Sequence, residues 1–168
     1  EKMRGSGVTF SLYSFIKSVT FDSSEENVQV LYEKIISSCP LYINQQIFDL
    51  MTALGKENCS IVTHGDHEFQ MDKIRRSVGT DMVKDIVVVS TTKAEAVAAI
   101  CDRYNDEEVI FVDDKLSFIN DLDFEKCSNL KTVLFNENGL ANMKAEIAES
   151  LQLENIKMKH AVNATHAE

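Results

Sequence analysis

The sequence predicts an α/β fold, in which an N-terminal helical segment precedes a doubly wound parallel sheet. Short, apolar and largely β-branched runs recur between about residues 59 and 135. Continuous apolar runs of this length are typical of strands buried on both faces of a parallel sheet. Helical patterns separate these runs, and strands that alternate with helices are typical of βαβ units.

The predicted strands comprise three strong runs and one weaker run. The strong runs are CSIVT at 59–63, IVVVS at 86–90 and EVIFVD at 108–113, and the weaker run is KTVLF at 131–135. Because ligands of doubly wound sheets bind beyond the carboxyl ends of the strands, the residues that follow these runs are the first candidates for a functional site.

The predicted helices of the sheet region lie between the strands. Residues 67–78 place Phe69, Ile74 and Val78 near one helical face, and residues 92–104 place Val97 and Ile100 on another. Both segments therefore suit helices that cover a parallel sheet.

The first 55 or so residues contain no convincing strand. Helical patterns appear near 9–18, 27–38 and 43–54, and Pro40 stands where a new helix could start. Asp22 or a neighbouring serine is expected to cap a helix that begins near Glu25. A last amphipathic helix is predicted after Gly139, followed by a polar tail.

The composition of the chain argues against several classes of function. The chain has 168 residues, 44% of them apolar, and a formal charge of −10, which argues against a nucleic-acid partner. It contains no apolar run near the 18 or so residues that span a bilayer, so no membrane partner is expected. The four cysteines lack CxxC spacing and are expected to be buried free thiols in a cytoplasmic setting.

Polar residues stand at the ends of three predicted strands. Thr63, followed by His64 and Gly65, ends the first, Lys93 follows the second, and the pair Asp113-Asp114 ends the third. A hydroxyl and helix-start amides can hold phosphate oxygens, an ammonium can neutralise their charge, and adjacent carboxylates can hold a hard divalent cation. The order of these groups predicts a phosphate and magnesium site at one rim of the sheet.

Over about residues 25–150 the chain resembles the haloacid-dehalogenase-like (HAD) superfamily. The resemblance is carried by IVTHGD at 61–66, TTKAEAV at 91–97 and VIFVDDKLSFI at 109–119, which follow the order of the family's motifs. Response-regulator receiver domains use similar groups, but their acidic pair comes first in the chain, whereas here it comes last.

The HAD resemblance implies a set of roles. Thr63 and Lys93 would act on the phosphoryl group, with His64 and Gly65 beside it, and Asp113 and Asp114 would hold Mg²⁺. The implied activity is a magnesium-dependent phosphohydrolase for a small phosphorylated metabolite. The resemblance also implies three regions: a partial helical cap at 1–38, a Rossmann-like core at 39–152 and a polar tail at 153–168.

The nucleophile that the family uses is missing from these motifs. HAD phosphatases form an aspartyl phosphate on the first Asp of a DxDxT-type motif, and no DxDxT occurs in this sequence. We therefore expect the nucleophile strand upstream of Glu1, and no turnover by this chain alone. The alternative is a catalytically inactive binding or scaffold protein that keeps the HAD layout. Substrate identity and oligomeric state stay open.

Overall fold

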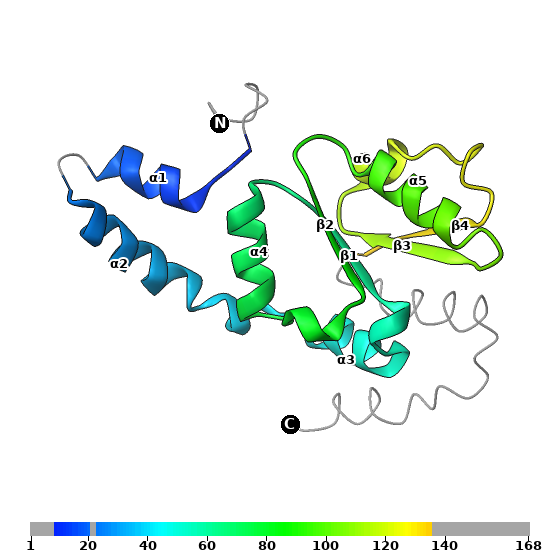
Figure 1. Cartoon of the computed structure of the whole chain (residues 1–168), viewed down its shortest axis with the longest axis horizontal. Coiled ribbons are helices and arrows are strands. Elements are labelled where there is room, and N and C mark those ends of the chain that lie inside the picture. Colours follow the sequence, from blue (N-terminus) through cyan, green and yellow to red (C-terminus); the bar gives the residue numbers. More distant parts are fainter. Residues whose placement is uncertain (1–8, 21–22, 136–168) are drawn as a thin grey trace. The chain divides into compact units, whose positions relative to one another are not determined.

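The computed structural model describes residues 9–20 and 23–135 (Figure 1). The chain divides between Thr91 and Thr92 into two compact units, which are described separately. Within the described residues, no helix has the length and apolar character needed to cross a membrane.

Unit 1 begins with two helices, α1 (Leu12–Val19) and α2 (Glu25–Ile36). The side chains of Ser11 and Ser24 accept hydrogen bonds from the first-turn amides of Ser14 and Asn27, so each helix has the serine N-cap that its start requires. One core cluster joins the helices, and its α2 members follow the i, i+4, i+8 spacing of one helical face. The buried members are Leu12, Ile16, Val28, Tyr32 and Ile36.

A short connection leads from the helices to the first sheet. It consists of the 3-10 helix η1 (Cys39–Tyr42), α3 (Gln45–Leu54) and the 3-10 helix η2 (Lys56–Asn58). Pro40, where a helix start was expected, lies in the first turn of η1, which begins one residue earlier at Cys39. Asn44 caps α3 by accepting from the amide of Ile47.

The first sheet has two parallel strands, β1 (Ser60–His64) and β2 (Asp85–Val89), in register from Ser60↔Asp85 to His64↔Val89. Between them lie α4 (His67–Arg76) and the 3-10 helix η3 (Thr80–Met82). This β-α-β order is the one that the apolar runs predict.

Unit 2 contains α5 (Ala94–Arg103), β3 (Val109–Asp113), α6 (Leu116–Asn120) and β4 (Leu130–Leu134). Strands β3 and β4 are parallel, with Val109 opposite Leu130 and Asp113 opposite Leu134. The core lies between α5, α6 and the sheet, and its buried members are Val97, Cys101, Phe111, Ile119, Leu122, Cys127 and Leu130.

The mixed α/β class and the alternation of strand and helix are confirmed for the described residues. Their four strands form two parallel two-stranded sheets, β1-β2 and β3-β4. The single doubly wound sheet stays a prediction. The division between Thr91 and Thr92 falls inside the predicted 39–152 core, and the predicted helix after Gly139 and the tail lie outside the described residues.

The cysteines are free thiols, as expected: Cys59, Cys101 and Cys127 are buried, while Cys39 is half-buried. Burial, and to a lesser extent the neighbouring Cys127, raises the pKa of the Cys101 thiol to about 12. Because reactivity follows the thiolate, this environment is typical of an inert structural cysteine.

The raised pKa of Cys101 predicts a loss of stability at high pH. A thiol whose folded-state pKa is above its unfolded value favours folding while it is protonated, so this contribution is lost as pH rises from about 9 toward 12. Urea denaturation at pH 8 and pH 10.5 measures the loss, which we expect to be smaller in Cys101→Ala than in the unmodified chain. An equal loss in both proteins would contradict the prediction.

Candidate functional site

Of the predicted phosphate-binding residues, Thr63 and His64 are the last two residues of β1, and Gly65 follows directly after the strand. We call this strand end, Thr63 to Gly65, the Thr63 loop. The hydroxyl of Thr63 donates a hydrogen bond to Oε1 of Gln70, at 3.1 Å. The Nε2 of Gln70 donates to the backbone oxygen of His64, also at 3.1 Å. Gln70, from the first turns of α4, therefore closes the loop through both ends of its side-chain amide.

Gly65 has a structural reason to be glycine. Its φ is +148°, a conformation that side chains disfavour. A Cβ built there would lie 2.5 Å from Nε2 of Gln70. The Gly65 amide donates to the carbonyl of Val89 at 2.9 Å, which ties the loop to the end of β2. Asp66 then caps α4 by accepting from the amide of Phe69.

In unit 2, Lys93 and Asp113 form a buried ion pair. Lys93 stands at the N-cap of α5, and Asp113 is the last residue of β3. The Nζ of Lys93 lies 2.5 Å from Oδ2 of Asp113, with side chains 12% and 4% exposed. The other carboxylate oxygen, Oδ1, accepts from the backbone amide of Lys115 at 2.8 Å. Both oxygens of Asp113 thus face positive or donor groups.

Aromatic rings complete the surroundings of this ammonium. The Nζ of Lys93 lies 4.7 Å from the ring centroid of Phe118 and 5.8 Å from that of Phe111. Cation–π attraction of this kind favours a charged amine in a site with little water. Asp114, by contrast, is exposed.

The structure brings the predicted residues together in two groups. Thr63, His64 and Gly65 share a loop in unit 1, while Lys93 and Asp113 are in direct contact in unit 2, with Asp114 adjacent in the chain. That the two groups surround one phosphate stays a prediction. The sequence reading missed Gln70 and Phe118. Asp66 could have pointed to Gln70 from the sequence. As the N-cap it determines where α4 begins, and therefore which side chain of the first turn lies against the loop.

The two aspartates carry carboxylate oxygens, the kind of ligand atom that binds Mg²⁺. Mg²⁺ prefers oxygen ligands and is usually held by one or two carboxylates together with waters and substrate phosphates. A carboxylate has about four acceptor positions, so the two donors on Asp113 leave room for a metal bond. Over residues 9–20 and 23–135, no cluster of three or more His, Cys, Asp or Glu side chains is placed to hold a metal.

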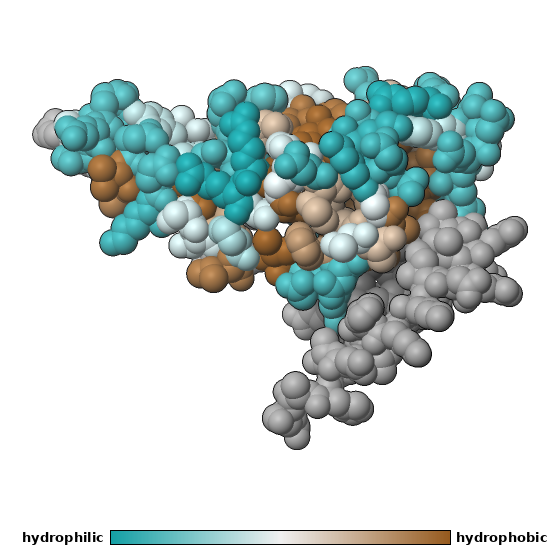
Figure 2. All heavy atoms as spheres, turned by 60° about the horizontal axis from the view of Figure 1, so that its bottom comes forward, coloured by the Kyte–Doolittle hydropathy of each residue, from teal (hydrophilic) through white to brown (hydrophobic). Residues whose placement is uncertain are grey.

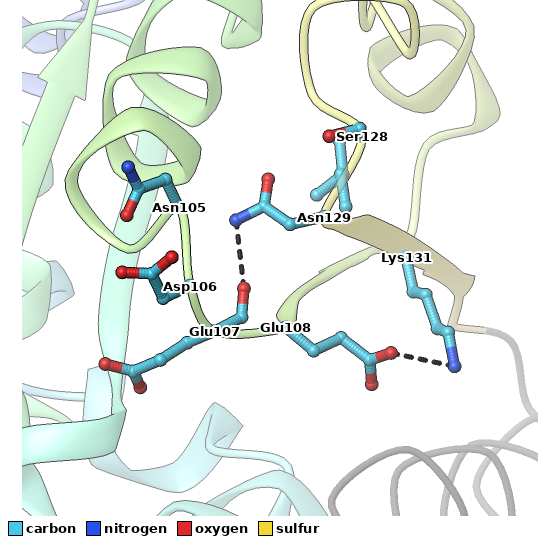
Figure 3. A pocket seen from close by; sticks show the side chains of 8 residues that line it. Asn105, Asp106, Glu107, Glu108, Ser128, Asn129 and Lys131 are labelled. Carbon is cyan, nitrogen blue, oxygen red and sulfur yellow. Dashed lines mark hydrogen bonds and ion pairs between the residues drawn. The ribbon is translucent and has the colours of Figure 1, made fainter.

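A hollow of about 320 Å³ lies at the opposite end of the second sheet, where β3 and β4 begin (Figure 3). The side-chain amide of Asn129 donates there to the carbonyl of Glu107, and Lys131 pairs with Glu108 at 2.8 Å. Asn129 also donates to the carbonyls of Cys101 and Tyr104, which ties the start of β4 to the end of α5. These side chains have structural roles, away from the strand ends that carry Asp113.

Comparisons of the chain with protein-family models, with curated proteins and with solved structures give no match.

Proposed function

We propose that this chain is the larger part of a HAD-like, magnesium-dependent phosphohydrolase that acts on a small phosphorylated metabolite. The buried pair of Lys93 and Asp113 is the observation that carries the proposal. It places an ammonium and a carboxylate together at the carboxyl end of a parallel strand, which is where ligands of α/β sheets bind.

The strand pairs support a doubly wound fold with one further strand. The classic doubly wound order is 3-2-1-4-5-6, in which the chain starts in the middle and winds outward on both sides. If an upstream strand is strand 1, β1 and β2 take the positions of 2 and 3, and β3 and β4 those of 4 and 5. The observed pairs, β1-β2 and β3-β4, are the two that this order requires.

Each residue has a distinct role in the proposed reaction. Thr63 donates its hydroxyl to a phosphoryl oxygen, with His64 and Gly65 beside it. Lys93 neutralises charge that develops on the transferring group, which is the main contribution a protein makes in phosphoryl transfer. Asp113 and Asp114 would hold Mg²⁺, whose chemistry when bound is to neutralise phosphate charge. The nucleophile is an aspartate on the upstream strand.

One set of contacts favours a second candidate, a non-catalytic binding or scaffold protein with the same layout. The Lys93 ammonium is already neutralised by Asp113, and the Thr63 hydroxyl already donates to Gln70. A protein that never binds phosphate would satisfy its polar groups in this way. This candidate predicts no turnover in any form of the protein, including one that carries the upstream segment.

Turnover of a generic phosphate ester with Mg²⁺ by the full-length protein tests the proposal. Lys93→Met should lower kcat by about 10²- to 10³-fold, as expected when a charge-stabilising donor is removed. Lys126→Met is the matched control, because Lys126 lies in the same unit with its side chain 78% exposed, and its kcat should be unchanged. Circular dichroism confirms that both variants are folded.

Two outcomes would reject the proposed roles. Equal kcat in Lys93→Met and the unmodified protein would remove Lys93 from the reaction. Absence of turnover in the full-length protein, with Mg²⁺ present, would favour the scaffold candidate.

A further inference from the structure

The orientation of the Gln70 side-chain amide is determined by its partners. One end of the amide faces the carbonyl oxygen of His64, which can only accept a hydrogen bond, so that end must be Nε2. Oε1 therefore faces the hydroxyl of Thr63, at 3.1 Å. Since Oε1 can only accept, the Thr63 hydroxyl must be the donor in this contact.

This contact uses the one hydrogen that Thr63 can offer to an anion. A hydroxyl has a single donor hydrogen, and a phosphate oxygen is an acceptor that requires it. Gln70 Oε1 and a bound phosphate therefore compete for the same donor. The Thr63 hydroxyl therefore cannot donate to Gln70 and to a phosphate at the same time.

The side chain of Gln70 also occupies the space beside Gly65. The position that a Cβ of Gly65 would take lies 2.5 Å from Nε2, 3.1 Å from Cγ and 3.2 Å from Cδ of Gln70. Gly65 is buried beneath this side chain. An anion that approaches the Thr63 hydroxyl from the Gln70 side must displace this side chain, which extends from the first turn of α4.

We propose that Gln70 is an internal competitor that lowers the affinity of the Thr63 loop for phosphate and holds the loop closed until an anion displaces it. The inference rests on the proposed function, because it takes the loop to be the phosphate site. Gln70 is thereby a specificity-determining residue: only ligands whose oxygens compete with a neutral amide acceptor open the loop, which favours a dianionic phosphoryl group over uncharged acceptors.

Two substitutions at position 70 should shift phosphate affinity in opposite directions. Gln70→Met keeps the length of the side chain and removes the acceptor, so inorganic phosphate should bind about fivefold more tightly, which is the effect of one hydrogen bond of ordinary net strength. Gln70→Glu places a carboxylate against the Thr63 hydroxyl and beside the incoming anion, so phosphate should bind at least about tenfold more weakly. Gln46→Met is the matched control, because Gln46 is an exposed glutamine of α3 in the same unit.

Binding is followed in the 168-residue chain by titration with inorganic phosphate, with the backbone amide resonances of Thr63 and Gly65 as the readout. We expect Gln70→Met to bind phosphate more tightly than the unmodified chain, and Gln70→Glu to bind it more weakly. A merely structural role for Gln70 predicts that both substitutions loosen the loop and weaken binding. That result, or equal affinity in all four proteins, would overturn the inference.

The outcome is distinguishable from a failure of the proposed function. If the order of affinities is as expected while the full-length protein shows no turnover, the enzyme proposal fails and the role of Gln70 stands. If phosphate shifts neither resonance in any of the four proteins, the loop is no anion site, and both the competitor role and the phosphate assignment of Thr63 are rejected.

Discussion

Asp113→Ala should lower the free energy of unfolding of unit 2 by about 3 to 5 kcal/mol, because it leaves a buried ammonium without its carboxylate. The Lys93 side chain is only 12% exposed, so water cannot replace the missing partner at its place in the fold. The substitution also removes the acceptor for the Lys115 amide, which bonds to Oδ1 at 2.8 Å. Both losses act at the point where β3 leads into α6.

Native-state hydrogen exchange of the β3 and β4 amides measures this loss locally, which suits a chain of two units. Asp114→Ala is the matched control, since Asp114 is the adjacent carboxylate and is exposed, and its effect should stay within about 0.5 kcal/mol. The double variant Lys93→Met/Asp113→Leu should recover much of the stability, because apolar pairs of similar volume replace buried ion pairs at little cost. Equal effects of the two alanine substitutions would contradict a buried pair.

Ile36→Ala should destabilise unit 1 by about 3 kcal/mol, within the 2 to 5 kcal/mol range of buried Ile-to-Ala changes. Ile36 is 1% exposed and closes the core between α1 and α2. Removing its side chain leaves a cavity that the short helices cannot fill without moving.

Ile35→Ala offers a control of the same residue type, one position earlier in the same helix. Ile35 is 50% exposed, and it belongs with Val30 and Leu31 to the apolar side chains that α2 leaves at the surface. Figure 2 shows apolar side chains among polar ones in the N-terminal helical region, at the left of the view. Ile35→Ala should change the free energy of unfolding by less than about 1 kcal/mol. Urea denaturation followed by far-ultraviolet circular dichroism measures both variants, and a loss in Ile35→Ala as large as in Ile36→Ala would contradict the assigned core.

Much of the local structure could be predicted from the sequence, because its causes are local. The helix expected near Glu25 is capped by Ser24, one of the nearby residues considered for that role. The predicted strand at 59–63 is observed at Ser60–His64, and that at 86–90 at Asp85–Val89. Shifts of one residue are ordinary, because strand ends are defined by backbone hydrogen bonds, which need not begin and end with the run of apolar side chains.

The candidate site was predictable only in part. The order of Thr63, Lys93 and Asp113 at strand ends predicts that they meet at one edge of a sheet. In the structure Lys93 and Asp113 are in direct contact, and the meeting of all three stays a prediction. No sequence pattern indicated that the Thr63 hydroxyl would donate a hydrogen bond to Gln70, seven residues later. The conformation of Gly65 and the start of α4 at the Asp66 cap must both be known before that contact can be seen.

By itself, the sequence determined which segments become helices and strands and which polar residues stand at the strand ends, because periodicity and capping act over a few neighbouring residues. Only the tertiary structure decided how the four described strands pair, in parallel as β1-β2 and β3-β4, and that Lys93 is buried against Asp113. These outcomes join residues some twenty positions apart. They depend on competing ways of burying the same apolar faces, which a local pattern does not distinguish.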